Sequence, residues 1–232
     1  MTTFSEIRAR AEERKGGAAA LAAQLPQVKP RAALLELKDD RVLSAMAQRV
    51  FSAGFAWSVI EAKWPGFEIA FLGFEPGPLA LSPDAFWDGL TKDERIVRHG
   101  AKILSVRENA GFLLDIAKEH GSFGTFLHGW DPADQVGLLD LLAKRGSRLG
   151  GNTGQMLLRQ LGWDGFITST DMVAALIDAG VATSPEAKSK KDLAAIQAQM
   201  NAWAQETGLP VTHISRICAM STGSNPGPDE GH

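Results

Sequence analysis

Apolar residues recur at three- and four-residue spacing along most of the chain, whereas the alternation of β-branched residues that is typical of strands is scarce. One apolar stripe follows Asp39 and Asp40, so this acidic pair predicts the start of a helix. Lys191 to Glu206 and Val211 to Met220 predict two further amphipathic helices. The pattern therefore predicts an all-α fold.

Glycine and proline mark the expected helix ends. A short helix over 55–63 is expected to stop at Trp64-Pro65-Gly66. Residues 221–232 contain no apolar stripe, and we expect them to form a disordered tail. Three pairs place a capping oxygen before a proline and predict helix starts: Ser82-Pro83, Asp131-Pro132 and Ser184-Pro185.

Composition removes several classes of function. Cys218 is the only cysteine among 232 residues, which excludes a disulfide framework and any multi-cysteine zinc site. The histidines are scattered, and no nucleotide phosphate loop or dinucleotide fingerprint is present, so we expect neither a metal nor a cofactor. No apolar run approaches the roughly 18 residues of a membrane span, and the first residues lack a signal segment. We expect a cytoplasmic monomer with no membrane partner.

Charge is unevenly distributed along the chain. The formal net charge of −3 argues against a nucleic-acid partner when it is taken over the whole sequence. However, residues 95–107 and 141–163 hold eight of the 24 Lys and Arg residues and no acidic residue. The rest of the chain then has 16 basic residues against 27 acidic ones. The positive charge is concentrated in two short segments, which is typical of a protein that contacts DNA along one face.

The second basic segment has the form helix, tight link, helix. Its link contains Gly150 and Gly151, whose amides are expected to point outward at the start of the second helix, beside Asn152. Arg145 and Arg148 flank this position, so the arrangement predicts a site for a DNA phosphate without base readout. The alternative is an ordinary pair of helices with a solvated basic face.

Three segments, in this order, resemble the 3-methyladenine DNA glycosylase I family of the helix-hairpin-helix glycosylase superfamily. The residues 53–57, AGFAW, resemble the family's A-G-x-x-W element; RIVRHGAKI resembles its I-I-R-H-R-G-K-I stretch; and AKRGSRLGGNTGQMLLRQLG resembles its K-K-R-G hairpin and following helix. The resemblance spans residues 39–163. It implies a two-lobed helix-hairpin-helix glycosylase fold, here one domain over residues 1–220 with two interleaved lobes.

The resemblance also implies a reaction, which is hydrolysis of the N-glycosidic bond of an alkylated purine such as 3-methyladenine in double-stranded DNA. Such enzymes flip the base out of the stack, so Phe55 is the expected wedge and Trp57 the expected wall of the base pocket. Glu61, one turn after Trp57, is either a pocket acid or a solvated surface residue. The family stretch places Arg98, His99 and Lys102 on phosphate, with a helix cap as the alternative for His99.

Two further positions point in opposite directions. Arg49 stands where the family has a pocket glutamate; the chain also has no tyrosine and lacks the family's zinc ligands. Arg49 favours an alternative function, a catalytically inactive helix-hairpin-helix protein that recognises damaged or bent duplex. Asp171 favours the enzyme, because many superfamily glycosylases place a catalytic aspartate about twenty residues beyond the hairpin. A helix N-cap is the alternative role for Asp171.

Overall fold

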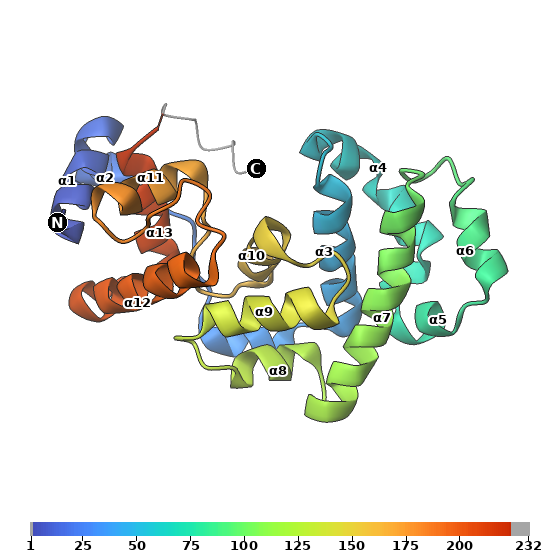
Figure 1. The fold of residues 1–232 in the computed structure, drawn as a ribbon. Helices are drawn as coiled ribbons and strands as arrows, with labels where there is room; N and C mark the ends of the chain where they lie inside the picture. The colour runs from blue at the N-terminus through green and yellow to red at the C-terminus, as the bar shows by residue number, and fades with distance from the viewer. Residues whose placement is uncertain (1, 224–232) are drawn as a thin grey trace. The chain divides into compact units, whose positions relative to one another are not determined.

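The computed structural model describes residues 2–223, and every regular element in that range is a helix, which confirms the all-α prediction (Figure 1). The α-helices are α1 (Phe4–Lys15), α2 (Ala18–Ala22), α3 (Asp39–Ser52), α4 (Trp57–Ala70), α5 (Pro76–Leu81), α6 (Asp84–Leu90), α7 (Gly100–His120), α8 (Phe123–Gly129), α9 (Gln135–Arg145), α10 (Gly151–Leu161), α11 (Thr170–Asp178), α12 (Lys190–Thr207) and α13 (Val211–Ser221). Two 3₁₀ helices lie within this series: η1 (Arg31–Glu36) between α2 and α3, and η2 (Leu72–Phe74) between α4 and α5.

The helices divide into two compact units. Among the described residues, unit 1 comprises residues 2–29, 131–136 and 164–223, and unit 2 comprises residues 30–130 and 137–163. Each unit is built from segments that are not consecutive in the sequence, and each encloses a hydrophobic core of its own.

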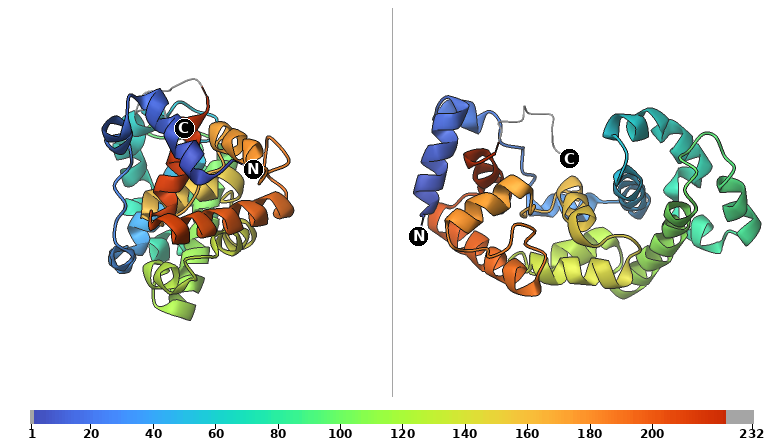
Figure 2. Two further views of the ribbon diagram at one scale, coloured as in Figure 1. Left: turned by 90° about the vertical axis from the view of Figure 1, so that its left-hand side faces the viewer. Right: turned by 45° about the horizontal axis from the view of Figure 1, so that its top comes forward.

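Unit 1 brings the two ends of the described chain together. Figure 2 shows the blue α1 beside the red α13, which also packs on α11. In its core the rings of Phe4 and Trp203 lie 5.3 Å apart. Cys218 is buried in the same core, and this burial raises the pKa of its thiol to about 12. The thiol is therefore protonated at neutral pH, which excludes Cys218 as a nucleophile.

Unit 2 is organised around aromatic side chains of α3, α4 and η2. Phe51 is fully buried, and its ring lies 4.7 Å from that of Phe67. Trp64 stacks on Phe67 at 4.9 Å and on Phe74 at 5.5 Å. These contacts give α3 and α4 a common apolar seam, so the segment that joins the two helices is held at both of its ends.

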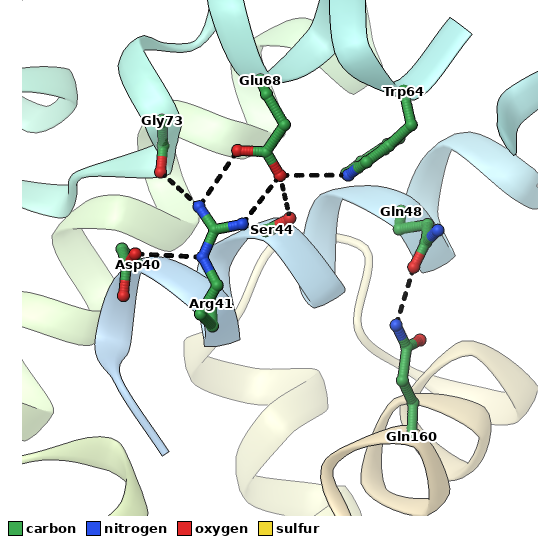
Figure 3. A network of polar contacts seen from close by, with 8 residues as sticks. All are labelled: Asp40, Arg41, Ser44, Gln48, Trp64, Glu68, Gly73 and Gln160. Atoms are coloured by element: carbon green, nitrogen blue, oxygen red, sulfur yellow. Dashed lines mark hydrogen bonds and ion pairs between the residues drawn. The ribbon is translucent and has the colours of Figure 1, made fainter. Parts of the chain in front are cut away.

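A polar network reinforces the same seam (Figure 3). The half-buried carboxylate of Glu68 accepts hydrogen bonds from Arg41 at 2.9 and 3.0 Å, from Ser44 at 2.9 Å and from Trp64 at 3.1 Å. Burial alone would raise the pKa of Glu68, but these donors, led by Arg41, outweigh it and lower the pKa below its ordinary value. Arg41 also donates to the backbone oxygen of Gly73, which ties η2 to α3.

The structure corrects the predicted end of α4. The helix runs through Pro65 to Ala70 instead of stopping at Trp64-Pro65-Gly66. Pro65 has no N–H to donate to the carbonyl of Glu61, one turn earlier, but Glu61 is exposed. The buried Phe67 and Ala70 continue the apolar stripe beyond the proline, so the helix continues as well. Gly66 is needed for close packing, since a Cβ atom there would lie 2.5 Å from the Arg95 carbonyl oxygen.

Two of the three proline-marked helix starts are also wrong. α6 begins at Asp84, directly after Pro83, but Asp131 and Ser184 each close a turn, and the next helices begin four and six residues later. The side chain of Asp131 accepts from the backbone amide of Ala133 at 2.9 Å, and that of Ser184 accepts from Glu186 at 3.4 Å. A short polar side chain before proline initiates such turns as readily as helices.

The predicted tail starts later than expected. Ser221 is buried and is the last residue of α13. Thr222 donates its hydroxyl to the Asp171 backbone oxygen at 2.6 Å, and Arg14 donates to the backbone oxygens of Thr222 and Gly223. The remainder of the predicted tail, 224–232, lies outside the described residues.

Candidate functional site

The link between α3 and α4, residues 53–56, presents a large apolar side chain to solvent. Gly54 has a φ of 81°, a left-handed conformation that favours glycine, and it turns the chain sharply after α3. Phe55 follows and is 43% exposed, an unusual state for phenylalanine beside a well-packed core. The structure thus places the predicted wedge at the tip of a short, tethered link.

Lys102 of α7 holds this link by hydrogen bonds to its backbone. Its side chain is buried, and its Nζ donates to the backbone oxygens of Phe51 at 3.0 Å and Ala53 at 2.5 Å. The ammonium also lies 4.8 Å from the centre of the Phe55 ring. Burial, followed by the repulsion of Arg148, lowers the pKa of Lys102.

These contacts correct the prediction that Lys102 binds phosphate. Its ammonium is turned into the protein, where it caps the last carbonyls of α3 and holds the 53–56 link. The basic segment predicted a cation here but not the direction of its side chain, because position 102 lies on the buried face of α7 among apolar neighbours.

Arg49 and Trp57 meet across the link. The Arg49 guanidinium lies over the indole ring of Trp57, 4.6 Å from its centre. Arg49 also donates through Nε to Gln160 Oε1 at 2.5 Å, and Gln160 in turn donates to Gln48 Oε1 at 2.7 Å, the contact drawn in Figure 3. Neither glutamine was among the predicted site residues, because the contacts of both depend on Gln160, which lies far from Arg49 and Gln48 in the sequence.

Arg49 is half-buried and, within residues 2–223, contacts no carboxylate. Burial therefore lowers the pKa of Arg49, although the group stays charged. By contrast Glu61, the other predicted pocket residue, is exposed and makes no hydrogen bond or ion pair with the described part of the chain. The structure brings Arg49 and Trp57 together and leaves Glu61 on the surface, as its alternative interpretation expected.

The predicted helix, tight link and helix are present as α9, residues 146–150 and α10. Two glycines permit the close turn, since a Cβ atom would lie 2.6 Å from Leu149 Cδ1 at Gly146 and 2.5 Å from the Leu149 carbonyl oxygen at Gly154. Asn109, buried in α7, clamps the link by accepting from the amide of Ser147 at 2.7 Å and donating to its carbonyl at 3.1 Å. Asn109 was not among the predicted site residues; the signal that could have found it is a polar residue on the buried face of a helix.

The exposed side of this link offers uncapped amides and one exposed cation. Gly150 is the N-cap of α10 and supplies no side-chain cap, so the first amides of the helix lack that partner. Gly150, Gly151 and Asn152 are exposed. Arg148 is exposed, has a φ of 60°, and makes no ion pair with any residue in 2–223.

The other residues predicted to contact phosphate differ in whether other groups of the protein already engage their side chains. Arg145 is engaged with Glu119 by two hydrogen bonds of 2.8 and 2.9 Å, so much of its charge is compensated within unit 2. His99 caps α7, since its Nδ1 accepts from the Lys102 amide at 3.3 Å, which confirms the cap that was its alternative role. Arg98 is exposed, next to this cap.

Asp171 lies in unit 1, in the first turn of α11. The N-cap of that helix is Ser169, whose hydroxyl accepts from Met172 at 3.3 Å, so the N-cap interpretation of Asp171 is wrong. Its carboxylate accepts no hydrogen bond from residues 2–223, and a Cβ on Gly223 would collide with it. A carboxylate that is not used for capping is available for chemistry or for the helix dipole.

Neither a metal site nor a membrane-spanning helix is found among the described residues. Among residues 2–223, His, Cys, Asp and Glu side chains form no group of three that would hold a metal ion. None of the helices described for this range combines the length and the apolar character that crossing a bilayer requires.

Part of the chain is similar to known proteins of one kind. Residues 34–143 match the family model for methyladenine glycosylase. One similar solved structure, of 3-methyladenine DNA glycosylase I from Staphylococcus aureus, is 22% identical, covering 66% of this chain and 92% of that chain with a TM-score of 0.49. Another, of a variant of 3-methyladenine DNA glycosylase I in complex with 3-methyladenine, is 25% identical over 54% of this chain and 78% of that chain, with a TM-score of 0.48.

Proposed function

We propose that this chain, whose residues 34–143 match the family model for methyladenine glycosylase, is a DNA glycosylase that releases an alkylated purine. The observation that carries the proposal is the exposed Phe55 on its glycine-turned link, with the Arg49–Trp57 pair beside it. A wedge and an aromatic surface on one short link are what base extrusion requires, because the wedge fills the gap that the flipped base leaves.

The proposed contact with DNA is made by backbone phosphates at the α9–α10 link. The uncapped amides after Gly150 and the charge of Arg148 suit an anionic oxygen, and neither reads a base. Arg145 contributes less, because Glu119 already occupies its guanidinium.

The proposed reaction is hydrolysis of the N-glycosidic bond, with 3-methyladenine as the reference base. Positive charge builds on the sugar as this bond breaks, so a carboxylate close to the sugar stabilises the transition state and activates water. We assign this role to Asp171, which the α11 cap leaves unused. An already cationic base leaves readily, and therefore asks for less catalysis.

Release of free base from methylated duplex DNA, followed by chromatography, tests this function. Wild type is expected to release base, and Asp171→Asn is expected to lower the rate about 100-fold with an unchanged melting temperature. Unchanged release by Asp171→Asn would remove Asp171 from the reaction. If wild type binds the methylated duplex but releases no base from it, the assigned reaction on methylated bases is overturned and the binding-only alternative is favoured.

That alternative is a catalytically inactive protein that binds damaged or bent duplex, and Arg49 is the observation that favours it. A guanidinium occupies the Trp57 face that a flipped base would otherwise stack on. The base-release experiment separates the two functions directly, since both require DNA binding and only one requires product.

The salt dependence of DNA affinity tests the phosphate contact. Arg148→Ala is expected to weaken duplex binding and to reduce the slope of log affinity against log salt by about 1. Arg145→Ala, at the end of α9 directly before the link, is the matched control, and its slope should change by less, because Glu119 compensates that charge. Equal slopes for Arg148→Ala and wild type, measured by fluorescence anisotropy, would place the phosphate elsewhere.

A further inference from the structure

The Arg49 guanidinium has unused hydrogen-bonding capacity in a half-buried position. Its Nε is bound to Gln160, whereas its two terminal nitrogens have no partner within residues 2–223. The amide nitrogen of Gln48, whose oxygen accepts from Gln160, is equally unpaired among the described residues (Figure 3). These nitrogens are free to donate, so a ligand that binds beside Trp57 can use them by supplying acceptors.

The positive charge of Arg49 beside Trp57 is not balanced by an acidic side chain of the described residues. No described carboxylate contacts Arg49, and burial is the cause that lowers its pKa. The Lys102 ammonium adds a second cation at this link, 4.8 Å from the centre of the Phe55 ring. A base that carries its own positive charge would meet both cations and compete with Arg49 for the negative face of the Trp57 indole.

We propose that Arg49 is a specificity-determining residue which selects neutral alkylated purines with two acceptors on one edge and disfavours cationic ones. This inference rests on the proposed function, and it names the substrate class of that same site. A guanidinium reads two adjacent acceptors of a purine with a pair of parallel hydrogen bonds, and its plane also stacks on a base.

1,N6-ethenoadenine is a suitable probe for this class. It is neutral, and both N7 and the former amino nitrogen are bare acceptors, whereas adenine carries an amino donor at that position. It also cannot pair with thymine, so its extrusion from the duplex costs less than that of a normal base. Methylated DNA, which contains the cationic 3-methyladenine and 7-methylguanine, supplies the contrasting probe.

The test measures base release and equilibrium affinity with both probes, for wild type, Arg49→Glu and Arg49→Gln. Wild type is expected to prefer the ethenoadenine duplex. Arg49→Glu should lower the ratio of neutral to cationic release about tenfold or more, and Arg49→Gln should lower it by less, because it removes the charge without reversing it. Lys118→Glu, an exposed residue of α7 with the same change in net charge, should leave the ratio unchanged.

The outcomes separate the inference from the function on which it rests. Faster release of cationic bases by wild type, or an Arg49→Glu ratio equal to that of wild type, overturns the inference and leaves the glycosylase standing. If no base of either kind is released, the glycosylase fails, and the ratio of affinities for the two duplexes then decides on Arg49 alone. Should Arg49→Glu not fold, as judged by its melting curve, Arg49→Gln carries the comparison.

Discussion

Alanine at position 154 is expected to lower the free energy of unfolding by about 1–2 kcal/mol and to weaken duplex binding. The new Cβ atom would lie 2.5 Å from the Leu149 carbonyl oxygen and 3.1 Å from Leu139 Cδ2. A backbone oxygen cannot move aside as a flexible side chain does, so the whole 146–150 link must shift. This cost exceeds the gain of up to about 1 kcal/mol that alanine normally brings to a helix.

Gly111→Ala provides the matched control. Gly111 lies inside α7, where an added Cβ meets no atom within 4 Å, so alanine there is expected to stabilise the protein by about 0.5–1 kcal/mol. Urea denaturation of both variants measures whether each substitution raises or lowers the free energy of unfolding. Fluorescence anisotropy with a DNA duplex measures the affinity. If Gly154→Ala stabilises the protein as Gly111→Ala does, the close approach of the link to α10 does not contribute to the free energy of unfolding.

The contrast between these glycines shows what the sequence could and could not predict about the hairpin. The two helices and their tight link follow from the apolar spacing and from the glycine cluster. The pattern singled out Gly150 and Gly151. Gly151 has a φ of 59°, a left-handed conformation that favours glycine, whereas Gly150 has an ordinary φ of −82°. The close contacts are made by Gly146 and Gly154 instead. Close contacts depend on Leu149 folding back between the helices, which no local propensity encodes.

The direction of charged side chains was likewise beyond local patterns. Arg145, Arg148 and Lys102 all counted as basic residues of two exposed segments, but Glu119 engages the first and α7 buries the third. Each outcome is set by a partner more than twenty residues away. Phe55 was predictable because its exposure follows from the glycine turn itself, whereas the Arg49–Gln160 contact joins α3 to α10 and required the fold.

Replacing Lys102 with methionine is expected to loosen the 53–56 link and to reduce base release about tenfold or more, with a loss of about 2 kcal/mol in the free energy of unfolding. The ammonium donates to the carbonyl oxygens of Phe51 and Ala53 and faces the Phe55 ring. Methionine has a similar length and fills the same space, but it donates no hydrogen bond. The end of α3 then loses its cap, and the wedge loses the group that fixes its position.

Limited chymotrypsin cleavage after Phe55 reports on the link independently of activity. Cleavage should accelerate in Lys102→Met, because a loosened link fits a protease more readily, and should stay at the wild-type rate in Lys118→Met, which changes an exposed lysine of the same helix. Lys102→Arg, which keeps the charge and the donors, should restore part of the base release. Wild-type cleavage and release in Lys102→Met would show that Phe55 is held by the Gly54 turn and the α3–α4 seam alone, and Lys102 would then have no positioning role.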